Sequence, residues 1–281
     1  MFSLVKILLP VDFSETCLGG ARYAIPLMEQ FGSALTILHV ISPIDDLSAE
    51  VHEFNARRRR KAEKELGDFL CAALNHLAVR RILREGDPAE LIAEQALEDR
   101  SDLIMMPTHG YSPFRRLLLG SVTAKVLHDT DCAVWTGAHV AQGPPAEWIR
   151  LGHILCAIDT DTQSSGVLEW AAGLAGKFKS KLTLLHVLPR LDSPGEEYYA
   201  HEWRRLVLSE ATEAIAKIQH RVGTDAELIL ESGDVSKAVL AVAARLGTDL
   251  IVIGRGACDR ARLRTHAYGI IRGSQCPVVS V

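Results

Sequence analysis

The sequence lacks several patterns that would place it at once in a functional class. No apolar run in its 281 residues is long enough to span a membrane. None of its 6 cysteines forms a Cys-x-x-Cys pair, which argues against a zinc site. The formal net charge of -4 gives no sign of a nucleic-acid surface. We therefore predict a cytoplasmic protein with reduced thiols, no signal peptide, no membrane partner and no nucleic-acid partner.

The sequence also lacks three motifs of common enzyme classes. No Gly-x-Gly-x-x-Gly follows the first predicted strand, and no Gly-x-x-x-x-Gly-Lys-Ser/Thr loop occurs. The Gly-x-Ser-x-Gly elbow of hydrolases is absent. Hydrophobic residues make up 48% of the chain, which is ordinary for a globular core. The sequence thus predicts a globular protein outside these enzyme classes.

The chain consists of two copies of one pattern. An offset of 147 residues aligns four segments of the two halves, namely 6–12 with 153–159, 35–40 with 182–187, 86–87 with 233–234, and 102–106 with 249–253. The offset falls to 144 where residues 132–135 match residues 276–279, so the second copy lacks three residues in between. A period this long predicts two tandem domains, residues 1–138 and 150–281, joined by a linker over residues 139–149.

Strand and helix patterns alternate within each copy. In the first copy we expect strands at residues 5–11, 35–41, 79–83, 103–106 and 133–136. Helices are expected at residues 15–31 behind a Ser14 cap, at 48–76, at 89–97 and in a segment ending near 129. Five strands that alternate with helices predict an α/β fold with two tandem five-stranded, parallel, doubly wound sheets.

The segment after the fourth strand of the first copy is typical of an anion site. Residues 103–106 form the short apolar strand, a loop carrying Gly110 follows, and Gly120-Ser121 opens a helical pattern. The unpaired N–H groups of a helix's first turn attract phosphate, and glycine lets backbone approach it closely. Spacing alone is equally compatible with an ordinary strand-to-helix connection.

This segment resembles the phosphate loop of the universal stress protein family. That loop has the form Gly, two residues, Gly, nine residues, Gly, then Ser or Thr. The chain supplies Gly110, the nine-residue gap, Gly120 and Ser121, but Pro107 stands where the first glycine belongs. The resemblance implies strand order 3-2-1-4-5 and a bound ATP, ADP or AMP, with Mg²⁺ at the phosphates. It also implies an internal pseudo-dimer of the two halves through their fifth strands, with a homodimer as a further option.

Ligands of such sheets bind beyond the carboxyl ends of the strands, where the strand order reverses. The resemblance and this rule give the candidate nucleotide-binding residues, which are Pro10, Val11, Asp12, Val40, Met106, Pro107, His109, Gly110, Gly120, Ser121, Val122 and Thr123. Asp12 can accept hydrogen bonds from an adenine amino group or a ribose, or it can cap the first helix in competition with Ser14. Val40 resembles an adenine-contacting valine of the family, although a strand valine is also ordinary core.

Other polar groups favour structural or solvated roles. His39 and His186 recur at matching places without a carboxylate or cysteine at ligand spacing, so we interpret them as structural. His109, Arg115 and Arg116 lie in the loop and are within reach of a phosphate, or face solvent. The basic run at residues 57–61 precedes Glu63 and Glu65, which favours a solvated helix face.

The second copy has a damaged loop. The positions of Gly120 and Ser121 are taken by Arg264 and Thr265. A bulky arginine at the helix entrance disfavours the approach of a phosphate to backbone, so we predict that this half has lost nucleotide binding. The arginines at positions 255, 260, 262 and 264 bind another anion or face solvent.

The function implied is that of an adenine-nucleotide-binding universal stress protein, a regulatory or protective module in the stress response. No catalytic residue is evident, because the loop has no general base and no neighbouring pair of carboxylates for Mg²⁺. The alternatives are a slow ATPase or adenylyl-transferring enzyme of the same fold, and a nucleotide-free structural interaction protein.

Overall fold

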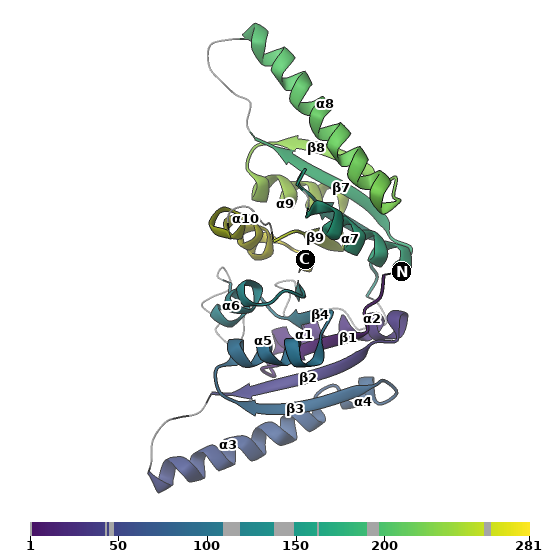
Figure 1. Ribbon diagram of the computed structural model, residues 1–281. Helices are drawn as coiled ribbons and strands as arrows, with labels where there is room; N and C mark the ends of the chain where they lie inside the picture. Colours follow the sequence, from purple (N-terminus) through teal and green to yellow (C-terminus); the bar gives the residue numbers. More distant parts are fainter. Residues whose placement is uncertain are drawn as a thin grey trace. The chain divides into compact units, whose positions relative to one another are not determined.

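The computed structural model divides the chain into two compact units, Ser3–Ile149 and Arg150–Val281, of which the second also takes in Met1–Phe2 (Figure 1). The residues described are 2–42, 44, 48–108, 119–137, 149–161, 163–189, 197–255 and 260–281. Each unit is an α/β layer structure, and each is taken here by itself. Within these ranges, no helix is both long and apolar enough to cross a membrane.

The first unit is built on five parallel strands. They are β1 (Lys6–Pro10), β2 (Ala34–Ile41), β3 (Val79–Glu85), β4 (Leu103–Met106) and β5 (Ala133–Thr136). Their order is β3-β2-β1-β4-β5, as predicted. All residues of β4 and β5 are buried, which explains why both strands are uniformly apolar or nearly so. The strand order reverses between β1 and β4, which places the switch point there.

Helices cover both faces of this sheet. They are α1 (Glu15–Ala21), α2 (Ala24–Phe31), α3 (Ala49–Asp68), α4 (Cys71–Leu74), α5 (Pro88–Asp99) and α6 (Ser121–Asp129). Right-handed crossovers run from β1 to β3 in one direction and from β3 to β5 in the other. They put α1 to α3 on one face and α5 and α6 on the other.

Two predicted helices are each broken in two. The helix expected at 15–31 is interrupted at Arg22 and Tyr23, because Pro26 has no N–H and would clash with a preceding carbonyl in a continuous helix. The helix expected at 48–76 ends at Asp68, and Leu70 adopts a left-handed φ of 50°. The guanidinium of Arg81 satisfies the carbonyls of Leu66 and Phe69 at this end.

The second unit repeats the pattern. Its parallel strands are β6 (His153–Ala157), β7 (Lys181–Leu188), β8 (Glu227–Ser232), β9 (Leu250–Ile253) and β10 (Val278–Ser280), ordered β8-β7-β6-β9-β10. Its helices are α7 (Ser164–Phe178), α8 (Glu197–Val222), α9 (Val235–Leu246) and α10 (Arg260–Gly273). Gly173 stands where the first copy has Pro26, and α7 is accordingly continuous.

The same polar ties recur in both units. His39 Nδ1 lies 2.7 Å from the carbonyl oxygen of Val11, and His186 Nδ1 lies 3.0 Å from that of Ile158. Because a carbonyl only accepts, each imidazole donates from Nδ1. These bonds join the second strand of each sheet to the turn that follows its first strand, which fits the structural role predicted for both histidines.

The basic run of α3 is a solvated helix face, as predicted. Arg57 pairs with Glu53, and Arg59 lies 3.1 Å from Glu63 and 2.8 Å from Glu85. Lys61 lies 3.7 Å from Glu65. Exposed pairs of this kind each contribute at most about 1 kcal/mol, so they neutralise the charge more than they stabilise the fold.

The five described cysteines are free thiols with very different environments. Burial raises the pKa of Cys17 to about 12 and also raises the pKa of Cys156, whereas Cys71 is exposed. Because the thiolate is the reactive form, we expect iodoacetamide near pH 8 to label Cys71 in the native protein while Cys17 and Cys156 react only after unfolding. Mass spectrometry of the labelled peptides checks this. Labelling of Cys156 as fast as Cys71 would contradict the packing of β6.

Candidate functional site

The predicted crevice residues before the loop lie along one edge of the first sheet. Pro10 ends β1, Met106 ends β4, and Val40 is the last residue but one of β2. Strand β1 pairs with both β2 and β4, so these three carboxyl ends are adjacent. Val40 is half-buried, and Pro10 and Met106 are buried.

Asp12 lies in the turn after β1 and is tied to Ser14. Its Oδ1 accepts hydrogen bonds from the Ser14 N–H at 3.0 Å and the Ser14 hydroxyl at 2.6 Å. Ser14 itself is the N-cap of α1, because its Oγ accepts from the Cys17 N–H at 3.1 Å. Of the two residues considered for the cap, Ser14 is the one that caps α1, and Asp12 orients Ser14 through Oδ1.

Phe13 stabilises this turn in a way that the sequence did not signal. Its φ of 63° lies in the left-handed region, which an aromatic residue rarely adopts. Its ring centroid lies 4.4 Å from that of His39 and 5.9 Å from that of Phe69. Ring packing and the His39 bond to Val11 therefore hold the backbone on both sides of Asp12.

A backbone hydrogen bond closes the base of the glycine-containing loop. The Gly120 N–H donates to the Thr108 carbonyl at 2.8 Å, and Thr108 is buried. The Thr123 hydroxyl donates to the Pro107 carbonyl at 3.0 Å. The predicted contacts at His109 and Gly110, and the arginines at 115 and 116, lie outside the described residues.

The loop leads into the N-terminus of α6. Gly120 is the N-cap, with φ -61° and ψ 143°, so its value lies in its lack of a side chain and not in an unusual φ. Ser121, expected near the cap, is instead the first helical residue and is exposed. Within the described part of the chain, no hydrogen bond uses the N–H of Ser121, Val122 or Thr123. The roughly half positive charge of a helix N-terminus therefore stands at a turn whose three donors have no partner among the described residues.

Lys125 is the lysine of α6 nearest this turn, and it is already engaged. Its ammonium lies 2.9 Å from Glu90 and 3.4 Å from Asp87 at the start of α5. The hydrogen bond to Glu90 raises the pKa of Lys125. This lysine joins α6 to α5 and is not directed by any recorded contact to the loop.

The second unit has a different geometry at the corresponding place. Fourteen residues, 107–120, separate β4 from α6, whereas six, 254–259, separate β9 from α10. The second connection is shorter by eight residues. Three of these are deleted from the sequence, and the other five belong to α10, which begins at Arg260 although Thr265 is the residue that aligns with Ser121. The helix entrance is thereby moved by roughly 7.5 Å of helix rise, and Arg264 lies inside the helix.

The remaining groups of the second crevice are also rearranged. Asp159, which aligns with Asp12, is exposed and accepts from the Thr160 N–H at 2.8 Å. The tie to the serine at the start of the helix is made by Asp161, 2.7 Å from the Ser164 hydroxyl. Arg255 folds back so that one guanidinium nitrogen lies 3.3 Å from the Ser280 carbonyl. The tie made by Asp12 is thus made in the second unit by Asp161, and Asp159, which aligns with Asp12, does not make it.

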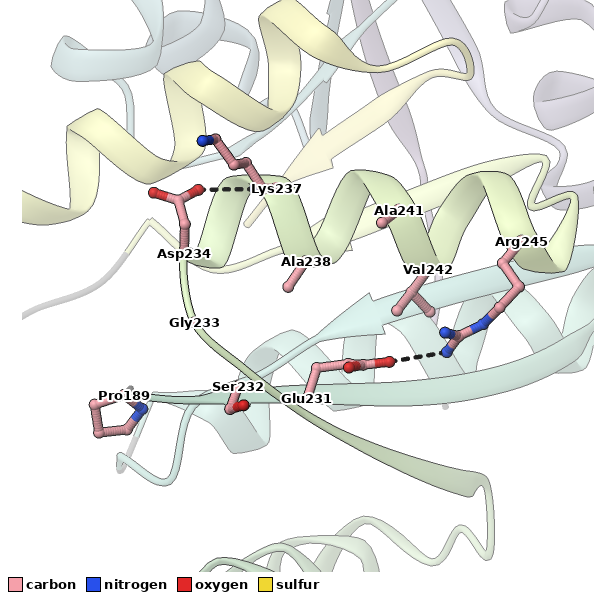
Figure 2. A pocket seen from close by; sticks show the side chains of 10 residues that line it. All are labelled: Pro189, Glu231, Ser232, Gly233, Asp234, Lys237, Ala238, Ala241, Val242 and Arg245. Carbon is pink, nitrogen blue, oxygen red and sulfur yellow. Dashed lines mark hydrogen bonds and ion pairs between the residues drawn. The ribbon is translucent and has the colours of Figure 1, made fainter. Parts of the chain in front are cut away.

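A hollow of about 810 Å³ lies elsewhere in the second unit, between β8 and α9 (Figure 2). It is lined by Pro189, Glu231, Ser232, Gly233, Asp234, Lys237, Ala238, Ala241, Val242 and Arg245. This hollow is at the sheet edge, away from the β6–β9 switch point. Sequence reasoning missed it, because the small residues that open it are unremarkable in a helix.

A resident metal site is not recorded in the described ranges, where no cluster of three His, Cys, Asp or Glu residues has a suitable arrangement. Asp12 is the one carboxylate among the candidate residues, and its Oδ1 is already used. Such a set does not fit a protein-held Mg²⁺, which needs oxygen ligands in octahedral array. The ion would have to come with the phosphates of a nucleotide.

Comparison with known proteins places this architecture in one family. A universal stress protein of Methanocaldococcus jannaschii is 31% identical over 136 residues, covering 46% of this chain and 79% of that protein. One from Thermus aquaticus is 32% identical over 130 residues, covering 46% and 94%. A crystal structure of a universal stress protein from Archaeoglobus fulgidus matches the whole fold, with a TM-score of 0.70, 23% identity, and coverage of 98% and 95%.

The sequence profile of the Universal stress protein family matches this chain twice, over residues 5–136 and 150–281. The two matches together span nearly the whole sequence, and they coincide with the two five-stranded units. The chain therefore belongs to the universal stress protein family and carries two copies of its domain in tandem.

Proposed function

We propose that the first half of this protein binds ATP or a related adenine nucleotide. The observation that carries the proposal is the α6 N-terminus, where the N–H groups of Ser121, Val122 and Thr123 have no partner among the described residues and stand behind a side-chain-free Gly120. Three such donors at a helix N-terminus suit a phosphate. The Thr108–Gly120 bond fixes where the loop begins and ends, so the donors stand at a defined place beside the β4 end.

The adenosine part is assigned to the edge formed by β1 and β2. Ser14 holds the Asp12 Oδ1 and so orients the carboxylate, which we assign to accept from an adenine amino group or a ribose hydroxyl. Val40 is half-buried, so it has apolar surface left for a base. Pro107 has a carbonyl that is already paired with Thr123, and proline needs no donor partner, so its place in the loop is compatible with binding.

In the second half we propose that nucleotide binding has been lost. The first turn of α10 begins five residues earlier than that of α6, and Asp159 is exposed. The whole protein then acts as a one-site regulatory or protective module in the stress response. A nucleotide-free interaction protein is the rival reading, since Pro107 departs from the family loop. Mass spectrometry of the purified, denatured protein separates the two readings, because a co-purified adenine nucleotide is expected only for the first.

A tryptophan at the α6 entrance should abolish binding. Gly120→Trp puts a large side chain where phosphate approaches and removes access to at least two donors. Losing two charged hydrogen bonds costs about 3–6 kcal/mol, or roughly a hundredfold to ten-thousandfold in affinity. Calorimetric titration of the full chain with ATP measures this. Arg264→Trp, at the matching position of the second half, is the control and should leave affinity unchanged with one site per chain. Two sites of equal affinity in the parent protein would refute the assignment.

We expect little or no turnover of the bound nucleotide. Hydrolysis needs an oriented water and neutralisation of charge at the γ-phosphate, and Lys125 is committed to Glu90 and Asp87. Phosphate release should therefore be far below the rate of about 1 per second of an ordinary enzyme. A rate at or above that level, lost in Gly120→Trp, would identify the protein as an ATPase.

We also propose that the two halves pair through their fifth strands as an internal pseudo-dimer. The motivation is that β5 and β10 follow the last helix of their units, and that edge strands this apolar favour pairing. Deleting the last four residues removes β10 and should lower the melting temperature and increase the hydrodynamic radius. Glu53→Ala, at an exposed position of α3, is the control and should leave both the melting temperature and the hydrodynamic radius unchanged. Unchanged stability and compactness after the truncation would rule the pairing out.

A further inference from the structure

Helices α5 and α9 occupy matching places in the two halves, but their solvent-exposed faces carry opposite charge. The exposed residues of α5 are Glu90, Glu94, Leu97 and Glu98. An offset of 147 carries these four positions to Lys237, Ala241, Ala244 and Arg245 on α9, and all four are again exposed. The spacing of i, i+4, i+7 and i+8 puts each set on one helix face. One face has three carboxylates around a leucine, and the other has two cations around alanines.

Leu97 is the most exposed large apolar side chain among the described residues, at 81%. A single exposed leucine is common on protein surfaces and means little alone. This one stands on the same face as three carboxylates, and its counterpart in the other half is Ala244. An apolar projection within a charged ring is the arrangement of a contact residue with a polar rim.

The charges of both faces are only partly neutralised within their own units. On α5, Arg84 lies 2.9 Å from Glu94 and 3.9 Å from Glu98, while Lys125 takes Glu90. Two cations therefore serve three glutamates and the neighbouring Asp87. On α9, Arg245 lies 3.0 Å from Glu231. The ammonium of Lys237 has no ion pair within the described ranges, and Asp234 accepts a hydrogen bond from the backbone N–H of Lys237.

The hollow beside α9 can accommodate an apolar side chain. Ala238 and Val242 point from α9 toward β8, Ala241 also contributes to the lining, and the Glu231–Arg245 pair lies at one end (Figure 2). The matching positions of the first half carry the longer side chains of Leu91, Glu94 and Gln95. The second half thus has smaller side chains than the first half at these three positions.

We propose that the α5 face of one copy of this protein docks on the α9 face of a second copy. Glu90 and Glu98 are eight residues apart, as are Lys237 and Arg245, so an antiparallel crossing brings Glu98 to Lys237 and Glu90 to Arg245. Leu97 then meets the hollow at Ala238. The contact joins unlike surfaces, so it is heterologous and each copy keeps one of each face for further copies. It does not depend on a bound nucleotide.

Sedimentation velocity of the full-length protein tests the contact. A single helix face forms a weak interface, so we expect a dissociation constant between roughly 1 µM and 1 mM. Association should weaken as salt is raised from about 0.05 M to 0.5 M, because salt screens the charges. Leu97→Ser should weaken association about tenfold or more. Leu206→Ser, at a leucine 50% exposed on α8, is the matched control and should have no effect.

A mixing experiment decides whether the two faces are partners. Lys237→Glu damages the α9 face by placing a carboxylate opposite Glu98, and alone it should associate at least about tenfold more weakly than the parent, as Leu97→Ser does. A mixture of the two variants has one intact α9 face and one intact α5 face, so it should form dimers that stop there. Both substitutions are exposed, and unchanged melting temperatures verify the fold. A parent protein that stays monomeric throughout, or a mixture that does not dimerise, overturns the proposal.

Discussion

The position at which one helix begins governs the chemistry of each half. A helix leaves the N–H groups of its first turn without partners, and these groups attract anions only where the chain lets a ligand reach them. In the first half a backbone bond between Gly120 and Thr108 ends the loop and starts α6 beside the β4 end. In the second half the helix begins at Arg260, five residues before Thr265, which aligns with Ser121.

The scaffold around this difference is repeated closely. In both halves an aspartate before the fourth strand accepts two backbone N–H groups at the start of the first strand, at 2.7 and 2.9 Å for Asp102 and at 2.8 and 2.9 Å for Asp249. An aspartate also caps the helix after the third strand, as Asp87 and Asp234 do. Bonds of this kind to a charged group stabilise a fold by about 1.5–3 kcal/mol each. The second copy can thus change its loop and its helix faces while the sheet stays the same.

The sheet was predictable because buried strands are recognisable in the sequence as short apolar runs. The fourth and fifth strands of the first unit match the prediction residue for residue, since each is a short, fully buried run that ends at Pro107 or Gly137. The helix break before Pro26 was missed, although a proline in the third position of a helical turn is a recognisable signal. The early start of α10 was also missed. Its Arg-Ala-Arg-Leu-Arg sequence is rich in strong helix formers, whereas the alignment recorded only a three-residue deletion.

Details of the candidate site were harder to obtain from sequence because they depend on tertiary contacts. The left-handed φ of Phe13 has no sequence signal and is held by His39 and Phe69, which are distant in the chain. The Asp12–Ser14 tie was half expected, as competition for one cap, and turned out to be a shared arrangement. Opposite faces on α5 and α9 became visible only when exposure was known for each helical position.

Nucleotide binding by the first half alone depends on donors being available at α6 and absent from the matching place in the second half. Backbone ¹H–¹⁵N NMR of the full-length protein during an ATP titration observes these donors directly. The account predicts large shift changes for the amides of Ser121, Val122 and Thr123 and no comparable changes over residues 260–265. Equal perturbation of the two segments, or no perturbation at Ser121 to Thr123, would contradict it.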